Sequence, residues 1–444
     1  MLRASFVLSA LVGSILVAPP VAAAEWTVVH AGRLLAVPGV PPEVERSLIV
    51  RDGRIEEVRA GFVDAASVGA EGDEVEVVDL SRHFVLPGLI DAHVHLTGEL
   101  GPERKLLEVT RSDAATTLHA LPFLRRTLDA GFTTVRDLGG EPEIVFALRD
   151  AVAAGVVDGP RIVAAGASIA ATGGHGDSHG FREEILEMMA DSSICDGEAD
   201  CRRAVRAQVK RGADVIKVTA TGGVLSETAA GTDQQLFDDE LAAIVATAHA
   251  LGRKVAAHAH GVDGINAALA AGVDSIEHGT YSDETSFRLY RERGAFLVPT
   301  MLAGETVLEM AEDAEFFPPA IREKARRVGA EMKEMVRRAH AAGVPIAFGT
   351  DSGVSRHGTN GRELVLMVEA GMTPMEVIHA ATVNGARLLG READLGTLEA
   401  GKHADLVAVA GDPLADVSVL LAPDLVMQGG RVVKPLAAAP AAAP

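Results

Sequence analysis

A unit that repeats through the middle of the chain constrains its fold more than any other feature. Each copy has an amphipathic segment, a glycine and a short apolar run, and the glycines are Gly131, Gly155, Gly212, Gly252, Gly272, Gly294 and Gly343. A glycine just past a helix end is the usual left-handed cap. One helix is clear from its period, with Leu241, Ile244, Val245 and Ala248 behind a predicted N-cap at Asp238. The chain therefore alternates helices with buried strands.

Counting the apolar run that ends in DAHVHL gives eight strands, at residues 85–96, 133–138, 161–166, 215–220, 254–260, 275–279, 296–300 and 345–351. Eight strands alternating with helices predict parallel pairing, either in a closed (β/α)8 TIM barrel or in an open doubly wound sheet. Polar residues gather at the carboxyl ends of the first, fourth, fifth, sixth and eighth strands. Because these ends converge only if the sheet closes, the barrel is the predicted α/β fold.

The segments on either side of the barrel carry strand-turn-strand patterns instead. SLIVRDGRIEEV and DLVMQGGRVV place Asp-Gly and Gly-Gly at the turns, and both dipeptides are typical of hairpins. We expect residues 25–84 and 396–435 to pair into one small β-sandwich domain. Residues 85–395 then form the barrel.

The two ends of the chain differ in composition from both domains. A positive charge, an apolar stretch and small residues up to Ala24 have the pattern of a secretory signal peptide at residues 1–24. The alternative is an uncleaved membrane anchor, which Pro19 and Pro20 disfavour. Residues 436–444 contain little except alanine and proline, and we expect a disordered tail. The prediction is an exported protein, periplasmic or secreted.

Charge and cysteine content narrow the partners. The net charge of −21 disfavours nucleic acid and anionic membranes, since both require basic surface. The two cysteines, Cys195 and Cys201, lie in CDGEADC, where an oxidising compartment would allow a disulfide. They can equally stay free, and no histidine lies in this segment to suggest a metal site.

Six side chains at the ends of predicted strands have the types and positions of metal ligands: His93, His95, Lys217, His258, His278 and Asp351. His93 and His95 are two apart in one strand, so they point to the same side. With Asp351 they can hold one divalent ion, and neutral imidazoles with a carboxylate suit Zn²⁺. His258 and His278 can hold a second ion.

Lys217 is the unexpected member of this set. An ammonium group carries no lone pair and would repel metal ions. Reaction with CO₂ would convert the amine into a carbamate, a two-oxygen anion able to bridge both ions. The alternative is that Lys217 points outward and forms an ordinary salt bridge of the barrel.

A centre of this kind has a definite chemistry. A hydroxide that bridges two Zn²⁺ ions is a nucleophile at neutral pH, while one ion polarises a carbonyl. Asp351 can bind metal, take the proton from that hydroxide and deliver it to a leaving amine. The predicted reaction is hydrolysis of an amide-like bond, with Asp351 as the catalytic residue.

The motifs DAHVHL, IKVTATGGV, HAHG, IEHG and GTDSG, with GKHADLV at 401–407, resemble the amidohydrolase superfamily over residues 26–435. Together they resemble its binuclear, carboxylysine-containing branch of Xaa-Pro dipeptidase or prolidase-like enzymes, which is related to imidazolonepropionases. The resemblance implies a small-molecule substrate: a dipeptide, an N-acyl amino acid or an ochratoxin-type amide, cleaved as by a dipeptidase or carboxypeptidase. It also implies a homo-oligomer, and His258 rather than His260 as the ligand from the fifth strand. The motif itself allows either histidine, because both point to the same side.

Six further polar residues follow strands where a substrate would lie: His175, His179, His260, Arg136, Tyr281 and His357. The first two are in a glycine-rich loop, which could bring a histidine over the metals as an oxyanion donor. His260, Arg136 and Tyr281 are candidates for the carboxylate or carbonyl of the substrate. Arg136 can instead pair with a neighbouring carboxylate, and Tyr281 can instead pack with a wet hydroxyl.

Three functional hypotheses remain. A binuclear metallohydrolase requires all six ligand positions, and all six are filled. A mononuclear cyclic-amide hydrolase similar to imidazolonepropionase would not need Lys217. A non-catalytic barrel scaffold would be expected to have lost a ligand such as Asp351. Metal content separates the three, as two ions per chain, one or none.

Overall fold

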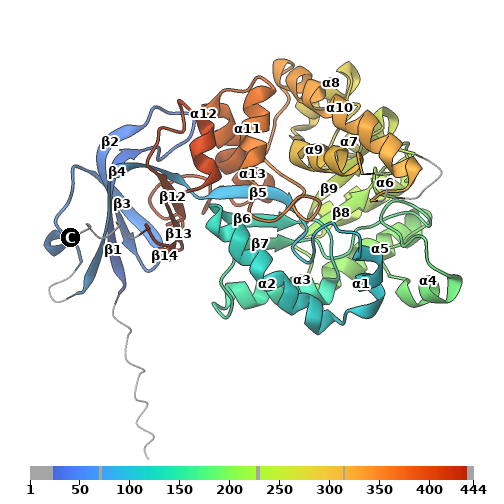
Figure 1. Cartoon of the computed structure of the whole chain (residues 1–444), viewed down its shortest axis with the longest axis horizontal. Coiled ribbons are helices and arrows are strands. Elements are labelled where there is room, and N and C mark those ends of the chain that lie inside the picture. The colour runs from blue at the N-terminus through green and yellow to red at the C-terminus, as the bar shows by residue number, and fades with distance from the viewer. Residues whose placement is uncertain (1–23, 70–72, 227–230, 314–315, 438–444) are drawn as a thin grey trace, which may run out of the picture.

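The computed structural model describes residues 24–69, 73–226, 231–313 and 316–437. The signal peptide expected at residues 1–24 lies outside them apart from its last residue, and the tail expected at 436–444 lies outside them apart from its first two. Figure 1 shows a small β-domain beside a larger unit of strands surrounded by helices. In the part of the chain that the structure describes, no helix combines the length and the apolar character needed to cross a membrane.

Both ends of the chain contribute to the small β-domain. Its strands form one sheet in the order β14-β13-β12-β4-β1-β2-β3. The central strand β4 pairs in parallel with β1 and antiparallel with β12, so it joins the N-terminal strands to the C-terminal ones. The strands are β1 (Trp26–Leu34), β2 (Glu43–Arg51), β3 (Arg54–Ala60), β4 (Val75–Pro87), β12 (Leu406–Val409), β13 (Leu425–Gln428) and β14 (Arg431–Lys434).

The sheet bends back over a shared core. Asp52 and Gly53 turn the chain between β2 and β3 with φ of +49° and +78°, as the dipeptide predicts. Arg54, the next residue, forms a β-bridge with His403, which lies three positions before the start of β12. Leu48, Leu80, Leu406 and Met427, from four different strands, are fully buried in one cluster. The two layers of the predicted sandwich are therefore two parts of a single sheet.

The larger unit is a parallel barrel that closes through two irregular joints. One sheet contains β5 (Leu89–Val94), β6 (Phe132–Asp137) and β7 (Arg161–Ala164), and the other contains β8 (Val215–Thr219), β9 (Lys254–Ala259), β10 (Ser275–His278) and β11 (Phe296–Val298). Ile169, after β7, bridges Val218 of β8. On the other side, Ile346 bridges Leu297 of β11 and Ser352 bridges Val94 of β5. The eighth member of the ring is thus the extended segment 345–352 rather than a regular strand.

The first barrel strand begins later than predicted. Residues 85–87 of the predicted strand at 85–96 are the end of β4 in the small domain. Gly88 separates β4 from β5, and a Cβ atom on it would lie only 2.2 Å from Oγ1 of Thr133 in β6. Glycine is therefore required where the chain passes from one domain into the other.

Helices follow the strands and surround the barrel (Figure 1). In α6 (Asp238–Ala250) the predicted apolar face is buried, but Asp238 is the first helical residue and not the N-cap, which is Phe237. The other helices are α1 (Arg104–Thr110), α2 (Asp113–Asp129), α3 (Pro142–Ala153), α4 (Glu183–Met189), α5 (Glu198–Arg211), α7 (Val262–Ala271), α8 (Glu284–Arg293), α9 (Met301–Met310), α10 (Pro319–Ala341), α11 (Arg362–Glu369), α12 (Pro374–His379) and α13 (Gly385–Leu389), with short η1 (Ala65–Ser67), η2 (Ala380–Asn384) and η3 (Val417–Leu421).

A disulfide joins the segment just before α5 to the first turn of that helix. Cys195 and Cys201 are bonded, with their Cα atoms 4.9 Å apart. Cys201 lies in the first turn of α5, while the backbone N–H of Cys195 donates to the carbonyl of Ala170 at 2.9 Å. The structure therefore selects the disulfide over two free thiols.

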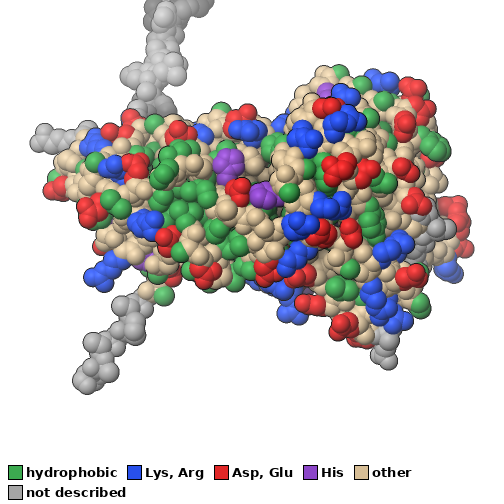
Figure 2. Space-filling view, turned by 90° about the horizontal axis from the view of Figure 1, so that it is seen from above, with side chains coloured by type: hydrophobic (Ala, Val, Ile, Leu, Met, Phe, Trp, Pro, Cys, Tyr) green, Lys and Arg blue, Asp and Glu red, His purple; other side chains and the backbone are tan. Residues whose placement is uncertain are grey.

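Charged side chains of both signs lie on the surface of the protein (Figure 2). Figure 2 shows a face on which acidic and basic side chains are interspersed rather than separated. The expectation that nucleic acid is not a partner stays a prediction from the net charge of −21.

Candidate metal centre

The structure brings all six predicted ligands to the carboxyl ends of the barrel strands. His93 lies in β5, Lys217 in β8, and His258 in β9, while His278 is the last residue of β10. His95 follows β5, and Asp351 lies in the extended eighth segment. The strand ends that carry these residues are neighbours in space because the barrel is closed.

Asp351 connects the eighth member of the barrel to the first. One carboxylate oxygen lies 3.1 Å from Nε2 of His95 and 3.5 Å from Nε2 of His93. The backbone of Asp351 has a φ of +57°, which few residues other than glycine adopt, and its N–H donates to the carbonyl of His93 at 2.7 Å. This constrained backbone directs the carboxylate toward the two histidines.

Lys217 points into the barrel, which decides between the two interpretations of this residue. Its side chain is buried, and Nζ lies 3.5 Å from Nε2 of His93. Burial lowers the pKa of Lys217 to about 8, although the carboxylates of Glu277 and Asp351 oppose the shift. More of the lysine is therefore a neutral amine near neutral pH, and that is the form that reacts with CO₂.

A second group of donors contains three histidines. Nitrogen atoms of His258, His260 and His278 all lie within 4.8 Å of one another, and the three side chains are buried. The ring of His258 is 4.8 Å from that of His260 and 4.7 Å from that of His278, between ring centroids. Both His258 and His260 therefore remain within reach of a metal ion held by His278.

The outer nitrogens of two ligand histidines, His95 and His278, have hydrogen-bond partners in the protein. Nδ1 of His95 donates to the carbonyl of Gly139 at 2.8 Å, and Nδ1 of His278 is hydrogen-bonded to Oγ1 of Thr300 at 2.7 Å. Partners of this kind fix the orientation of an imidazole and leave Nε2 for a metal. Both His278 and Thr300 have positive φ, at +71° and +52°. Backbone strain of this kind is concentrated at functional sites.

The protonation states suit a metal. Burial lowers the pKa of His93 and of His260 to about 4, and it also lowers the pKa values of His258 and His278. Burial alone would raise the pKa of Asp351, but the imidazoles of His93, His95 and His278 hold it well below its usual range. The site therefore offers four neutral imidazoles and an ionised carboxylate, which are the forms that bind divalent ions. His95 is the exception, because burial alone would lower its pKa but the carboxylate of Asp351 raises it. Donor atoms of His93, His278 and Asp351 lie within 4.8 Å of one another, as one ion would require.

Three of the predicted substrate contacts lie close to these donors. The ring of His175 is 4.3 Å from that of His258, and burial lowers the pKa of His175 to about 3. His260 stacks on His278 at 4.9 Å. The backbone N–H of Tyr281, just beyond β10, donates to the carbonyl of His260 at 3.0 Å, and its buried hydroxyl has no hydrogen-bond partner among the residues that the structure describes. Each can serve a bound substrate.

The side chains of the other three predicted substrate contacts bind other parts of the protein. Arg136 was expected to bind the substrate, but it is 1% exposed and its donors reach Ala92, Ser275 and Glu277 inside the barrel. Nε2 of His179 donates to the carbonyl of Gly174 within its own loop. His357 stacks on Phe123 and donates to the carbonyl of Gly98. The alternative interpretation of Arg136, an ion pair with a carboxylate, is the one that the structure shows.

Sequence reasoning missed two residues behind the ligands, Glu277 and Thr300. Glu277 precedes His278 in SIEHG, and neighbours in a strand point to opposite faces, so it was not expected near the site. Its Oε2 nevertheless lies 2.9 Å from Nδ1 of His93. The backbone of His278 has positive φ and so departs from the regular alternation, which allows both side chains to reach the site. Thr300 had no signal beyond its place at a strand end.

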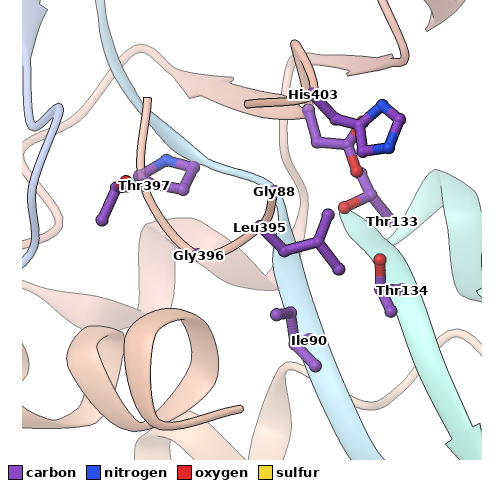
Figure 3. Close-up of a pocket in the computed structure, with 10 residues that line it drawn as sticks. Gly88, Ile90, Thr133, Thr134, Leu395, Gly396, Thr397 and His403 are labelled. Carbon is purple, nitrogen blue, oxygen red and sulfur yellow. The ribbon is translucent and has the colours of Figure 1, made fainter. Parts of the chain in front are cut away.

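A separate small pocket lies at the opposite end of the barrel (Figure 3). It is lined by Gly88 and Ile90, at the beginning of β5, by Thr133 and Thr134 of β6, and by His403 and Asp405 from the small domain. His93, the metal ligand in β5, lies toward the other end of that strand. The pocket therefore belongs to the junction of the two domains and not to the candidate metal centre.

Comparison with known proteins agrees with this architecture. The sequence profile described as the Amidohydrolase family matches residues 84–433. Ochratoxinase from Aspergillus niger is 34% identical over 440 residues, covering 93% of this chain and 87% of that protein. A crystal structure of a Xaa-Pro dipeptidase with methionine bound in its active site has a TM-score of 0.86 and 40% identity, covering 92% of this chain and 100% of that one.

A further solved structure, a prolidase complexed with N-methylphosphonate-L-proline, has a TM-score of 0.81 and 30% identity, covering 93% of this chain and 100% of that one. The family profile spans the barrel and most of the C-terminal strands of the small domain. The chain belongs to the amidohydrolase family.

Proposed function

We propose that this protein is a binuclear metal-dependent hydrolase that cleaves the amide bond of dipeptides or N-acyl amino acids, including ochratoxin-type amides. Its action would be that of an Xaa-Pro dipeptidase or a carboxypeptidase. The observation that carries the proposal is the position of Lys217, whose Nζ lies 3.5 Å from Nε2 of His93. A buried amine has no evident use beside metal ligands unless it becomes a ligand itself.

The residues divide between two ions, for which Zn²⁺ is the proposed metal. His93, His95 and Asp351 would hold one ion. His258 and His278 would hold the other, and Lys217 as a carbamate would offer one oxygen to each. Two such ions supply a water molecule of lowered pKa and polarise the scissile carbonyl.

The side chains of the protein would carry the proton and orient the substrate. Asp351 is ionised, so it can accept a proton from the attacking water and pass it to the leaving amine. His175, beside His258, can donate to the oxygen of the scissile carbonyl as negative charge develops on it. Tyr281 and His260 can bind the remaining polar groups of the substrate.

The relatives support an amino acid as the leaving group. Methionine is bound in the active site of one, and N-methylphosphonate-L-proline is bound to another. A third is an ochratoxinase. Which amino acid leaves would depend on the shapes of the loops expected around residues 175–190, 222–235 and 352–362, and residues 227–230 lie outside the described part of the chain.

The test is a library of dipeptides and N-acyl amino acids, assayed with the full mature chain in the presence of Zn²⁺ and bicarbonate. We expect release of a free amino acid, together with two metal ions per chain by elemental analysis. One ion per chain with cleavage of a cyclic amide would favour the mononuclear alternative. No bound metal and no hydrolysis would favour a non-catalytic scaffold.

Two further proposals concern the protein in the cell. Export to the periplasm or the medium is supported by the pattern of residues 1–24 and by the Cys195–Cys201 disulfide, because disulfides persist in oxidising compartments. Sequencing the N-terminus of the protein recovered outside the cytoplasm tests this. Assembly into a homo-oligomer is supported by family resemblance, and light scattering tests it.

A further inference from the structure

A buried chain of polar contacts lies behind His93. Nδ1 of His93 lies 2.9 Å from Oε2 of Glu277. The other carboxylate oxygen of Glu277 accepts from Nη2 of Arg136 at 2.9 Å and from Oγ of Ser275 at 2.5 Å. Glu277 and Arg136 are 0% and 1% exposed, so water does not compete for these contacts.

The two nitrogens of His93 face different surroundings. Nδ1 faces Glu277, while Nε2 faces Nζ of Lys217 and a carboxylate oxygen of Asp351, each at 3.5 Å. A neutral imidazole has one N–H and one lone pair. Neither Nδ1 of His93 nor Oε2 of Glu277 has another hydrogen-bond partner among the described residues, so the negative charge of the carboxylate favours a proton on Nδ1. The lone pair is then on Nε2, which is the nitrogen on the side of the other ligands.

Glu277 is itself held by three strands. Arg136 comes from β6, and its Nε donates at 2.6 Å to the carbonyl of Ala92, the residue before His93 in β5. Ser275 and Glu277 share the inner face of β10. The guanidinium therefore fixes the carboxylate of Glu277 relative to the strand that carries His93.

The group facing the outer nitrogen of His93 differs from the groups that face those of His95 and His278. The partner of His95 is a backbone carbonyl, and that of His278 is a threonine hydroxyl. A carboxylate partner carries a full negative charge, which holds the imidazole more firmly and makes it a stronger electron donor to a metal.

We propose that Glu277, held by Arg136 and Ser275, is a positioning residue that fixes His93 in the tautomer and orientation needed to bind a metal ion. This inference rests on the metal-dependent function proposed above. A merely structural role is the competing explanation, because removing one partner of a buried ion pair destabilises a protein wherever the pair lies.

The test measures metal binding directly. Full-length wild type and Glu277→Gln are stripped with a chelator and titrated with Zn²⁺ alone in a calorimeter. We expect Glu277→Gln to bind Zn²⁺ roughly 10- to 100-fold more weakly at one site, since loss of a partner behind a ligand histidine typically has this effect. Ser275→Ala, which removes one of the two donors to the same oxygen while keeping Arg136, should give a smaller loss of affinity.

The matched control is Asp405→Asn. Asp405 pairs with Arg161 at 2.7 Å and is largely buried, but it lies at the other end of the barrel. This variant should lose stability and keep the wild-type affinity for Zn²⁺. Wild-type affinity in a folded Glu277→Gln would overturn the positioning role, and if that variant does not fold, wild-type affinity in Ser275→Ala would do the same. Failure of the wild type to bind Zn²⁺ would instead overturn the proposed function itself.

Discussion

A carboxylate oxygen of Asp351 lies 3.1 Å from Nε2 of His95, although the two residues come from the last and the first members of the barrel. The contact exists because the ring closes between Val94 and Ser352, the immediate neighbours of these two residues. The pairing that closes the barrel therefore also brings these two metal-ligand candidates together.

Replacing Asp351 with asparagine should abolish turnover. The amide keeps the shape of the side chain but cannot accept a proton, and loss of a general acid-base group lowers rates by roughly 100- to 10,000-fold. The fold should be almost unaffected, as measured by circular dichroism and thermal melting. Full activity in a preparation whose metal content has been measured would rule out the proposed role of this residue.

Replacing Lys217 with alanine should remove both activity and at least one metal ion. Lys254, in the strand next to that of Lys217, provides the control because its Nζ donates to the carbonyl of Arg387 and does not face the ligands. Elemental analysis should find two ions per chain in Lys254→Ala and fewer in Lys217→Ala. Equal metal content in the two variants would show that Lys217 is not a ligand.

Periodicity predicted the fold because regular backbone leaves a regular pattern. The apolar runs gave the strands of the barrel, and Asp52-Gly53 gave a hairpin of the small domain. The eighth segment has the apolar residues of a strand, but only Ile346 and Ser352 form bridges, so its irregularity could not be read from composition. The start of β5 was misplaced for a similar reason, since one apolar run continues from β4 across Gly88.

The roles of site residues could be predicted where the residue type alone indicates the chemistry. They could not be predicted where the role depends on which other side chain the residue contacts in the fold. His93 and Lys217 are unusual at strand ends, and they proved to face each other. Arg136 is equally polar and equally close to a strand end, but its partner, Glu277, lies on the opposite side of the barrel and far away in the chain. Nothing in the sequence of either residue indicates that pairing.

Metal release should occur at an unusually low pH. Protons compete with a metal for imidazole lone pairs, and burial lowers the pKa of His93 and His260 to about 4 from the ordinary 6.5. The ion proposed at His258 and His278, whose pKa values burial also lowers, should therefore stay bound as the pH falls through 6.5 and be lost only near the lowered pKa values. A zinc-sensitive dye, read after incubation across this range, would report the midpoint. Half-release near pH 6.5 would show that these histidines are not desolvated.

The same shifts predict how the metal-free protein responds to acid. A histidine whose pKa is lowered by folding binds its proton more readily in the unfolded chain, so His93 and His260 favour unfolding as the pH falls from 6.5 toward 4. Asp91 and Glu363 have the opposite effect, because burial raises their pKa values to about 6 and about 8. Denaturant unfolding of the chelator-treated protein at several pH values would measure this. The same dependence on pH in the wild type and in a His93→Gln, His260→Gln variant would contradict the contribution of these histidines.

Removing the disulfide should destabilise the protein without changing its metal content. The bond closes a short loop, with a sequence separation of 6 residues. Closing a loop of this size in the unfolded chain is worth about 2 kcal/mol. The Cys195→Ser, Cys201→Ser double variant should therefore unfold at lower denaturant concentration than the oxidised wild type and behave like the wild type in reductant. Identical unfolding of the variant and the oxidised wild type would show that the bond does not form.

Gly223 should be required for activity because of its distance from His175. A Cβ atom at this position would lie 2.3 Å from the His175 ring, and the carbonyl of Gly223 is held at 2.7 Å by Nζ of Lys324. The loop is therefore restrained, so in Gly223→Ala the ring would have to move from its place beside His258. We expect kcat/KM to fall roughly 100-fold, as for a misplaced catalytic group.

Gly98 provides the control for the Gly223→Ala prediction. It also lies in a loop at the carboxyl ends of the strands, after β5, but a Cβ atom there would have no neighbour within 4 Å. Gly98→Ala should therefore keep wild-type activity, and both variants should keep their metal ions, because His175 is not one of the proposed ligands. A fully active Gly223→Ala would show that turnover does not depend on the placement of His175, while loss of metal would show that the loop supports the ligands themselves.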